Sequence, residues 1–202
     1  MTLPPDIPDP RFFSAVLQSP RLTLRPYSED RDLNAIAEIL TDNRVLKSMG
    51  LPPSSVSTES IRETRRSLIS RPDAGDWTIL PATGDESSII GEIGISEWDR
   101  QTFIADIFAA LHPGFQRMGY GSEAVSTLAG YIFETNPIAT VRVQTIESNK
   151  KAVRMAVNLG FRITGTKFVP PDPDTGFPGG NAVILDLRMH DLRAFDPEQP
   201  RE

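Results

Sequence analysis

One short stretch of the sequence has the residue types needed to hold a phosphate group. Gln116-Arg117-Met118-Gly119-Tyr120-Gly121-Ser122 follows a β-rich segment and precedes a run in which apolar residues recur at helical spacing. A helix N-terminus carries unpaired backbone N–H groups and a partial positive charge, so it can bind an anion. The two glycines let the backbone approach that anion, and Arg117 adds a charged donor. A strand-to-helix turn that needs glycine only for its geometry is the alternative interpretation.

The residues and the position of this stretch argue against two common phosphate-binding loops. The stretch lacks the Lys-Ser/Thr ending of a nucleoside-triphosphate loop. It also lies in the middle of the chain, after three consecutive β-rich segments, whereas a dinucleotide-binding fold places its glycine loop in an early βαβ unit. The elements around the stretch therefore decide how it is interpreted.

Hydrophobic spacing predicts the elements that position this stretch. Strands are predicted where apolar and polar residues alternate or β-formers cluster, over 22–25, 77–80, 89–96, 102–111, 140–146, 161–168 and 182–189. Helices are predicted where apolar residues recur every three or four positions, over about 28–40, 58–70, 119–136 and 149–159. Residues 169–180 contain four prolines and three glycines and are predicted to form a loop.

This order of elements, β-α-α-β-β-β-α-β-α-β-β, predicts an α+β fold. We expect a mixed, mostly antiparallel twisted sheet with helices on both faces. Residues 1–18 are expected to be an extended, loosely held proline-rich segment, residues 19–189 a single domain and residues 190–202 a polar tail.

Composition narrows the classes of partner. The chain has 202 residues, 39% hydrophobic and 24% charged, which is an ordinary globular balance. It contains no cysteine, and its two histidines lie apart from any carboxylate cluster, so no metal site is predicted. The formal net charge of −6 argues against nucleic acid as the main partner and fits a cationic substrate. No apolar run approaches the roughly 18 residues of a membrane span, and we expect a cytoplasmic protein with no membrane partner.

Three motifs together resemble the GNAT superfamily of acyl-CoA-dependent N-acetyltransferases. They read Gln-x-x-Gly-x-Gly-Ser-Glu-Ala at 116–124, Asn-x-x-Ala from Asn149, and Leu-Gly-Phe at 159–161. The opening Ser-Pro-Arg-Leu-Thr-Leu-Arg-Pro at 19–26 looks like the start of the RimJ/RimL branch, whose members acetylate protein N-terminal amines and diverse small amines. The resemblance runs from about residue 19 to residue 189 and implies acetyl-CoA as the co-substrate.

The resemblance also implies a set of cofactor contacts. Main-chain N–H groups from Arg117 to Ser122 are expected to bind the pyrophosphate of coenzyme A, and backbone groups from Ala109 to Leu111 are expected to pair with its pantetheine arm. Asn149, as the cap of the later helix, is expected to reach the same arm. Basic side chains of that helix are expected near the 3′-phosphate, with a solvated helix face as the alternative for each: Lys150, Lys151 and Arg154.

The implied reaction is attack of a primary amine on the thioester carbonyl in a ternary complex. The amine, with a pKa near 10, must first lose a proton to a base or a water chain. The developing oxyanion needs a preorganised donor, for which the resemblance implies the backbone N–H of Leu111. The departing thiolate benefits from a proton donor.

The sequence departs from the family at that proton donor. Many members carry a tyrosine seven residues after the asparagine, and this position is Ala156. Many RimJ/RimL-like members carry a serine three residues after it, and this position is Ala152. The strand before the loop reads Phe108-Ala109 in place of the usual Gly-Tyr or Gly-Trp. Ser148 and water are the remaining candidates for protonating the thiolate.

Carboxylates on the central strands are the candidates for the general base. Glu92 and Asp106 are the first two, with Glu97 behind them. Strand alternation would put Glu92 and Ser96 on one face, where one could act through the other and a bound water. The alternative for each carboxylate is a half-exposed side chain facing solvent. His112 precedes a proline and is predicted to have a conformational role.

The acceptor pocket is expected between the linker at 47–56 and the loop at 169–180. The acceptor is expected to be an amine-bearing small molecule or a peptide N-terminus, and a homodimer is a further possibility. Two other functions stay open. One is an acyl-CoA-binding protein of the same fold with little or no transferase activity, acting as a sensor or partner module. The other is a nucleotide-phosphate site, which predicts binding of ATP or NAD and none of coenzyme A.

Overall fold

A single mixed sheet forms the centre of the molecule, seen in a computed structural model that describes residues 11–85, 88–99 and 101–193. Its strands are β1 (Leu17–Gln18), β2 (Leu22–Pro26), β3 (Gly75–Pro81), β4 (Gly91–Asp99), β5 (Ile104–Leu111), β6 (Thr140–Ile146), β7 (Arg162–Val169) and β8 (Gly180–Leu187). They lie in the order β1-β2-β3-β4-β5-β6-β8-β7. Every neighbouring pair is antiparallel except β5 with β6, which are parallel. The predicted α+β fold with a mostly antiparallel sheet is confirmed.

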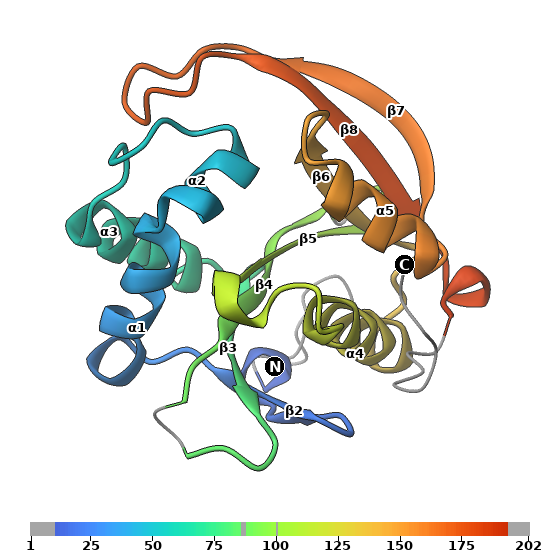
Figure 1. Ribbon diagram of the computed structural model, residues 1–202. Helices are drawn as coiled ribbons and strands as arrows, with labels where there is room; N and C mark the ends of the chain where they lie inside the picture. The colour runs from blue at the N-terminus through green and yellow to red at the C-terminus, as the bar shows by residue number, and fades with distance from the viewer. Residues whose placement is uncertain (1–10, 86–87, 100, 194–202) are drawn as a thin grey trace.

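Helices cover both faces of this sheet. They are α1 (Glu29–Thr41), α2 (Asn43–Met49), α3 (Thr58–Ile69), α4 (Tyr120–Thr135) and α5 (Lys150–Asn158), with short 3-10 helices at Phe12–Ser14, Pro113–Phe115 and Met189–Asp191. Figure 1 shows α1, α2 and α3 grouped on one side of β4 and β5, and α4 and α5 on the other. Hydrophobic packing follows this division, because α4 and α5 pack on the larger core and α1 and α3 on a smaller one.

Side-chain alternation along the central strands separates these two cores. The face toward α4 carries Trp77, Ile79, Ile93, Ile95, Ala105 and Ile107, all of them buried. The opposite face carries Ala110, which packs with Leu33, Ile36 and Ile61 of α1 and α3. It also carries the polar residues Thr78 and Glu92, both buried. The polar face of the sheet is therefore the one that α1 and α3 cover.

Residues 11–18 belong to the folded unit. Residues 11–18 were expected to be loosely held, yet Phe12 is buried and stacks on Tyr131 with ring centres 4.6 Å apart. The Trp77 indole donates a hydrogen bond to Ala15 O (2.8 Å), and β1 pairs with β2. At the other end, Arg193 N donates to Leu159 O (3.1 Å), so the start of the expected polar tail also contacts the domain. Residues 1–10 and 194–202 lie outside the described residues.

Helix α2 was not predicted, and it occupies part of the expected linker at 47–56. Asp42 caps it by accepting a hydrogen bond from Arg44 N (2.7 Å), and Gly50 ends it with φ +79°. Only Val45 and Leu46 are buried in its seven residues. A helix this short shows too few turns for apolar periodicity to be recognised.

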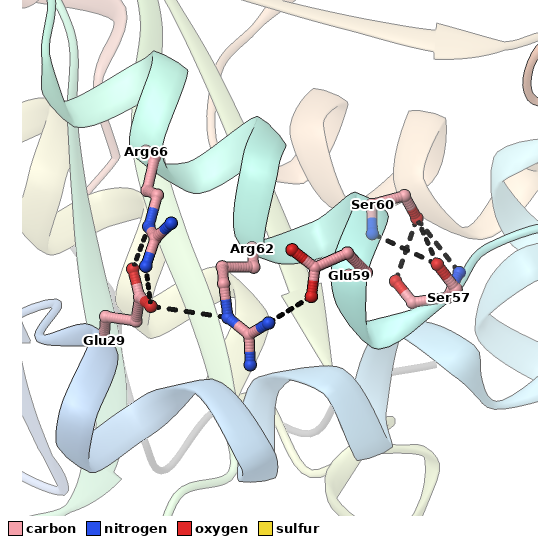
Figure 2. Close-up of polar contacts among 6 residues, drawn as sticks. All are labelled: Glu29, Ser57, Glu59, Ser60, Arg62 and Arg66. Carbon is pink, nitrogen blue, oxygen red and sulfur yellow. Dashed lines mark hydrogen bonds and ion pairs between the residues drawn. The ribbon is translucent and has the colours of Figure 1, made fainter.

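Polar contacts fix how α3 is rotated against α1. Figure 2 shows Glu29 of α1 accepting hydrogen bonds from Arg66 (2.7 Å) and pairing with Arg62, with N and O 3.4 Å apart. Ser57 and Ser60 form a reciprocal capping box at the start of α3. Because Arg62 and Arg66 bind a residue of α1, the intervening Arg65 is left to face the sheet, where it is buried.

Candidate functional site

The parallel strands β5 and β6 separate halfway along their length. Their pairing runs only from Ile104↔Thr140 to Ile107↔Val143, although β5 continues to Leu111 and β6 to Ile146. His112 N donates to Ile90 O on the β4 side (2.8 Å), so the N–H groups of Ala109 and Leu111 point to the opposite, opened side. Beyond Ile107, the backbone groups of β5 that face this gap therefore have no partner on β6 among the described residues.

The turn after β5 is held by two short-range contacts. Gly114 N donates to His112 Nδ1 (3.2 Å), which confirms a conformational role for this histidine. Gln116 Nε2 donates to Leu111 O (3.0 Å). These contacts set the distance between the end of β5 and the start of α4, and they place the glycine loop at the open end of the gap.

The glycine loop has the backbone geometry of an anion-binding helix start. Arg117 (φ +62°) and Gly119 (φ +84°) both adopt the left-handed conformation, and Gly119 is the N-cap of α4. The first hydrogen bond into the helix runs from Glu123 N to Gly119 O (3.1 Å). The N–H groups of Tyr120, Gly121 and Ser122 precede it and so have no acceptor within the helix. They are oriented to bind an anion together with the helix dipole.

A partly buried ion pair ties the β1–β2 hairpin to this loop. Glu123 is fully buried and accepts hydrogen bonds from Ser19 Oγ (2.9 Å), Arg21 N (2.8 Å) and Arg21 Nε (2.7 Å). Arg21 Nη1 also donates to Met118 O (3.1 Å), and its guanidinium lies 4.7 Å from the centre of the Tyr120 ring. Arg21 thus holds both the loop and the first turn of α4. Sequence reasoning missed this role of Arg21. The signal was Glu123, an acidic residue on the buried face of α4, which needs a basic partner.

Helix α5 follows β6 in the chain and packs against β6 and α4. Asn149 caps it by accepting a hydrogen bond from Ala152 N (3.3 Å). Ala156 is buried in the larger core and Ala152 is half-buried, so no hydroxyl is available at either position. Ser148, just before the cap, is exposed. The basic side chains of this helix are exposed as well: Lys150, Lys151 and Arg154.

Glu92 lies in a buried charged cluster. Its Oε1 is hydrogen-bonded to Nη2 of Arg65, and Arg65 Nε is 3.2 Å from Asp76 Oδ2. Burial raises the pKa of Glu92, and it raises the pKa of Asp76 well above its usual range. The alternative of a half-exposed carboxylate is therefore wrong for Glu92. It holds for Asp106, which is half-buried and accepts a hydrogen bond from Gln144 Nε2 across β5 and β6 (2.6 Å).

The predicted pairing of Glu92 with Ser96 is not formed. The register of β4 shifts between Ile95 and Glu97, so Ser96 is an extra residue that interrupts the alternation. Its hydroxyl donates to Asp106 O instead (3.2 Å). Glu97 is exposed beyond this bulge.

A pocket of about 440 Å³ opens where α2, β6 and the loop before β8 meet. Of the two segments that were expected to form the acceptor pocket, the linker at 47–56 contributes Gly50 to the lining and the loop at 169–180 contributes Phe177 to Gly180. A methyl group on Gly50 would lie 2.9 Å from Ile146 Cδ1 and 3.0 Å from Phe177 Cε2, so any side chain at this position would crowd two lining residues of the pocket. The complete lining is Gly50, Ile146, Glu147, Ser148, Lys150, Phe177, Pro178, Gly179, Gly180 and Asn181. Ser148 and Lys150 connect the pocket to the start of α5.

Two other kinds of feature are absent from the parts of the chain that the structure describes. No three His, Asp or Glu side chains there lie close enough to hold a metal ion. None of the helices there combines the length and apolar character needed to cross a membrane.

Comparison with known proteins gives the same architecture. The solved spermidine N-acetyltransferase from Vibrio cholerae in complex with CoA and spermine has a TM-score of 0.70 at 17% identity, covering 86% of this chain and 98% of that one. The solved RimL ribosomal L7/L12 alpha-N-protein acetyltransferase has a TM-score of 0.70 at 16% identity, covering 87% of this chain and 94% of that one. At these identities the likeness shows the fold alone.

Sequence comparison adds the family. The "Uncharacterized N-acetyltransferase YoaA" of Bacillus subtilis (strain 168) is 24% identical over 152 residues, which cover 74% of this chain and 84% of that protein. A family model described as "Acetyltransferase (GNAT) domain" matches residues 21–162, which include the glycine loop, Asn149 and Leu159-Gly160-Phe161. The chain therefore belongs to the GNAT family of acetyltransferases and is an N-acetyltransferase.

Proposed function

We propose that this protein moves an acetyl group from acetyl-CoA to a primary amine by direct attack in a ternary complex. The observation that carries the proposal is the continuity of two main-chain surfaces: the unpaired edge of β5 and the anion-binding start of α4. The pyrophosphate of acetyl-CoA would bind N–H groups from Arg117 to Ser122, with Gln116 bracing the turn. Its pantetheine arm would pair with Ala109 and Leu111 and meet Asn149, while Lys151 and Arg154 lie near the 3′-phosphate.

The proposed chemistry forms one C–N bond and breaks one C–S bond. The ammonium first loses a proton, and the nitrogen lone pair then attacks the thioester carbonyl. The N–H of Leu111 would stabilise the oxyanion, because it already points into the gap. Collapse of the intermediate expels the thiolate of coenzyme A, and the nitrogen gives up its second proton, which replaces the proton that the sulfur receives from its donor. Ser148, exposed at the pocket edge, is the proposed donor of a proton to the sulfur.

We propose Glu92 as the group that takes the first proton, with Asp106 as the second candidate. Glu92 is paired in register with Ala110, one residue before Leu111. Oε2 of Glu92 is buried and has no hydrogen-bond partner among the described residues. Asp106 is closer to solvent, but its Oδ1 is already bonded to Gln144. A base beside the oxyanion donor is what the reaction needs.

The pocket between α2 and the loop before β8 is the proposed acceptor site. Its α2 wall lies on the same side of the sheet as α1 and α3, which cover Glu92 (Figure 1), and the pocket reaches Ser148. We infer an acceptor of the RimJ/RimL kind, either an amine-bearing small molecule or a peptide N-terminus. The two solved neighbours support an amine acceptor, since one is named for spermidine and the other for a ribosomal protein. A cytoplasmic location and a homodimer stay predictions.

Thiol release tests this function against an acyl-CoA-binding protein without turnover. The second function is favoured by Ala152 and Ala156, which remove both usual hydroxyls. We expect the purified protein to release the coenzyme A thiol from acetyl-CoA only when an amine is added from a panel of peptides and small amines. A Ser148→Ala variant should bind acetyl-CoA normally and turn over more slowly. Binding of acetyl-CoA without amine-dependent thiol release would favour the non-catalytic function.

A further inference from the structure

Two carboxyl groups share one guanidinium on the buried face of β3 and β4. Arg65 of α3 contacts Asp76 of β3 through Nε, at 3.2 Å from Oδ2, and Glu92 of β4 through Nη2. The three residues, called here the Arg65 cluster, are exposed by only 8%, 4% and 2% in that order. Arg65 is held there because its helical neighbours Arg62 and Arg66 are bound to α1 at the surface (Figure 2). Two carboxyls therefore face one cation where water is excluded.

The hydrogen bonding of the Arg65 cluster is incomplete without a further proton. Both oxygens of Asp76 and Oε2 of Glu92 are buried and lack a hydrogen-bond partner among the described residues. A buried carboxylate oxygen without a well-directed donor is disfavoured, because it loses its water and the ion pair with Arg65 offsets only part of that loss. One proton on this carboxyl pair would both remove the excess negative charge and supply a donor.

Among the described residues, the neighbouring groups named below do not give the Arg65 cluster a second positive charge. Asp32 of α1 adds a negative charge, but it is engaged by Arg25 (2.6 Å), by Ser28 N (2.9 Å) and by Thr78 Oγ1 (3.1 Å). Arg31 pairs with the same carboxylate (3.2 Å). Glu29, the first residue of α1, is paired with Arg62 and Arg66. Tyr27 lies just before α1, and burial raises its pKa to about 12, so its hydroxyl stays neutral.

The two carboxyls differ in how well the charged form is held. Burial raises the pKa of Asp76 well above its usual range, and the charge of Glu92 raises it further, against the opposing effects of Arg65 and of the Trp77 backbone N–H. Burial also raises the pKa of Glu92, but both the charge and a direct hydrogen bond of Arg65 oppose that effect. Arg65 is therefore better placed to keep Glu92 ionised than to keep Asp76 ionised.

We propose that Asp76 and Glu92 hold one proton between them and that Asp76 carries it, leaving Glu92 as the ionised carboxylate of the Arg65 cluster. Arg65 and Asp76 are then positioning residues for Glu92. The catalytic consequence rests on the proposed function: a neutral Asp76 leaves Glu92 with the full charge needed to accept the amine proton on Oε2. The placement of the proton does not depend on that reaction.

Proton uptake on folding tests whether the carboxyl pair holds this proton. A carboxyl whose pKa is raised in the folded state loses its proton on unfolding, so stability falls as pH rises above the ordinary range of Asp. We expect the logarithm of the unfolding constant to rise with pH more steeply in the parent protein than in Asp76→Asn, by about one unit per pH unit between pH 5 and 8. Glu92→Gln should lose the same slope, because a single carboxyl on Arg65 needs no proton.

A carboxylate that is only partly buried provides the matched control. Asp186 also pairs with an arginine, Arg142 (2.7 Å), but it lies closer to solvent. Asp186→Asn should therefore keep the parent slope between pH 5 and 8. A parent slope equal to that of Asp76→Asn would overturn the shared proton.

Carbon NMR of the carboxyl groups decides which residue carries the proton. In protein labelled with ¹³C at the aspartate carboxyls, the resonance missing from Asp76→Asn identifies Asp76. We expect that resonance to keep the shift of a protonated acid from pH 5 to 8. An ionised shift across this range would overturn the assignment to Asp76.

Turnover separates this proposal from the catalytic one. Glu92→Gln should lower kcat at least tenfold with an unchanged dissociation constant for acetyl-CoA, and Asp76→Asn should keep the pH profile of kcat. A protonated Asp76 together with full activity of Glu92→Gln would retain the proton placement and remove Glu92 as the base.

Discussion

The two halves of the proposed site are built by different means. On the cofactor side, main-chain groups of β5 and of the loop at 117–122 form the binding surface, and one ion pair between Arg21 and Glu123 braces it. On the acceptor side, the pocket and the Arg65 cluster depend on side chains from α2, α3, β3, β4, β6 and the loop before β8. A surface made of backbone tolerates many sequences, whereas a surface made of side chains changes with each substitution. The comparison therefore predicts where substitutions alter cofactor binding and where they alter acceptor use.

Gly119→Asp should have the largest effect, and it should fall on the cofactor side. The new side chain places a carboxylate at the start of α4, and Gly119 has φ +84°, which disfavours a side chain. We expect the affinity for acetyl-CoA to fall by about 100-fold or more, or roughly 2.7 kcal/mol, measured by calorimetry. Gly130→Asp is the control: it adds the same charge to α4, where nothing lies within 4 Å of a new Cβ. An equal loss in both variants would contradict a local role for the loop.

Arg21→Ala tests whether the brace, and not only the loop, supports cofactor binding. It leaves the buried Glu123 with donors from Ser19 and the backbone alone. We expect a loss of about 1–2 kcal/mol in the free energy of unfolding, less than for a wholly buried pair because Arg21 is partly exposed. Urea denaturation measures this loss, and acetyl-CoA affinity should fall several-fold. Arg44→Ala removes an exposed ion pair and should change neither quantity.

Gly50→Ala addresses the acceptor side. The added methyl group would lie within 3.0 Å of both Ile146 and Phe177, and φ +79° adds strain of roughly 1 kcal/mol. We expect KM for the amine to rise several-fold while the dissociation constant of acetyl-CoA stays the same. Gly176→Ala is matched for strain, with φ +70°, but its methyl group meets only Pro52 at 3.4 Å. Similar amine kinetics in the two variants would mean that the pocket does not bind the acceptor.

Asn149 should show the smallest effect, divided between stability and binding. Asn149→Ala removes the cap of α5, at a cost of about 1 kcal/mol in stability, and a contact to acetyl-CoA worth about 1 kcal/mol, or roughly fivefold in affinity. Asn149→Ser keeps a capping oxygen and loses the amide. Denaturation and calorimetry on both variants should therefore show restored stability with affinity still reduced in the serine variant. Full affinity in both would remove Asn149 from the cofactor site.

The same contrast explains what could be predicted from the sequence. The glycine loop and the order of the strands along the chain depend on residues close together in the sequence, so spacing alone indicates them. The cap at Asn149 belongs to a short motif that the family resemblance identified. The Arg65–Glu92 contact joins residues 27 positions apart, and the Arg21–Glu123 contact joins residues 102 positions apart. No local pattern reports such partners, so Glu92 was identified as a candidate base without its buried surroundings. Helix α2 and the buried Phe12 were missed for a related reason, because tertiary packing stabilises these short segments.

Calorimetric titration of the purified protein with acetyl-CoA, coenzyme A and ATP in parallel tests the central claim most directly. If the edge of β5 and the start of α4 together form an acyl-CoA site, acetyl-CoA and coenzyme A should bind in the micromolar range and ATP should not bind. Binding of ATP without binding of either coenzyme A compound would mean that the glycine loop is a nucleotide-phosphate site. Absence of binding by all three would mean that the loop is only a turn between β5 and α4.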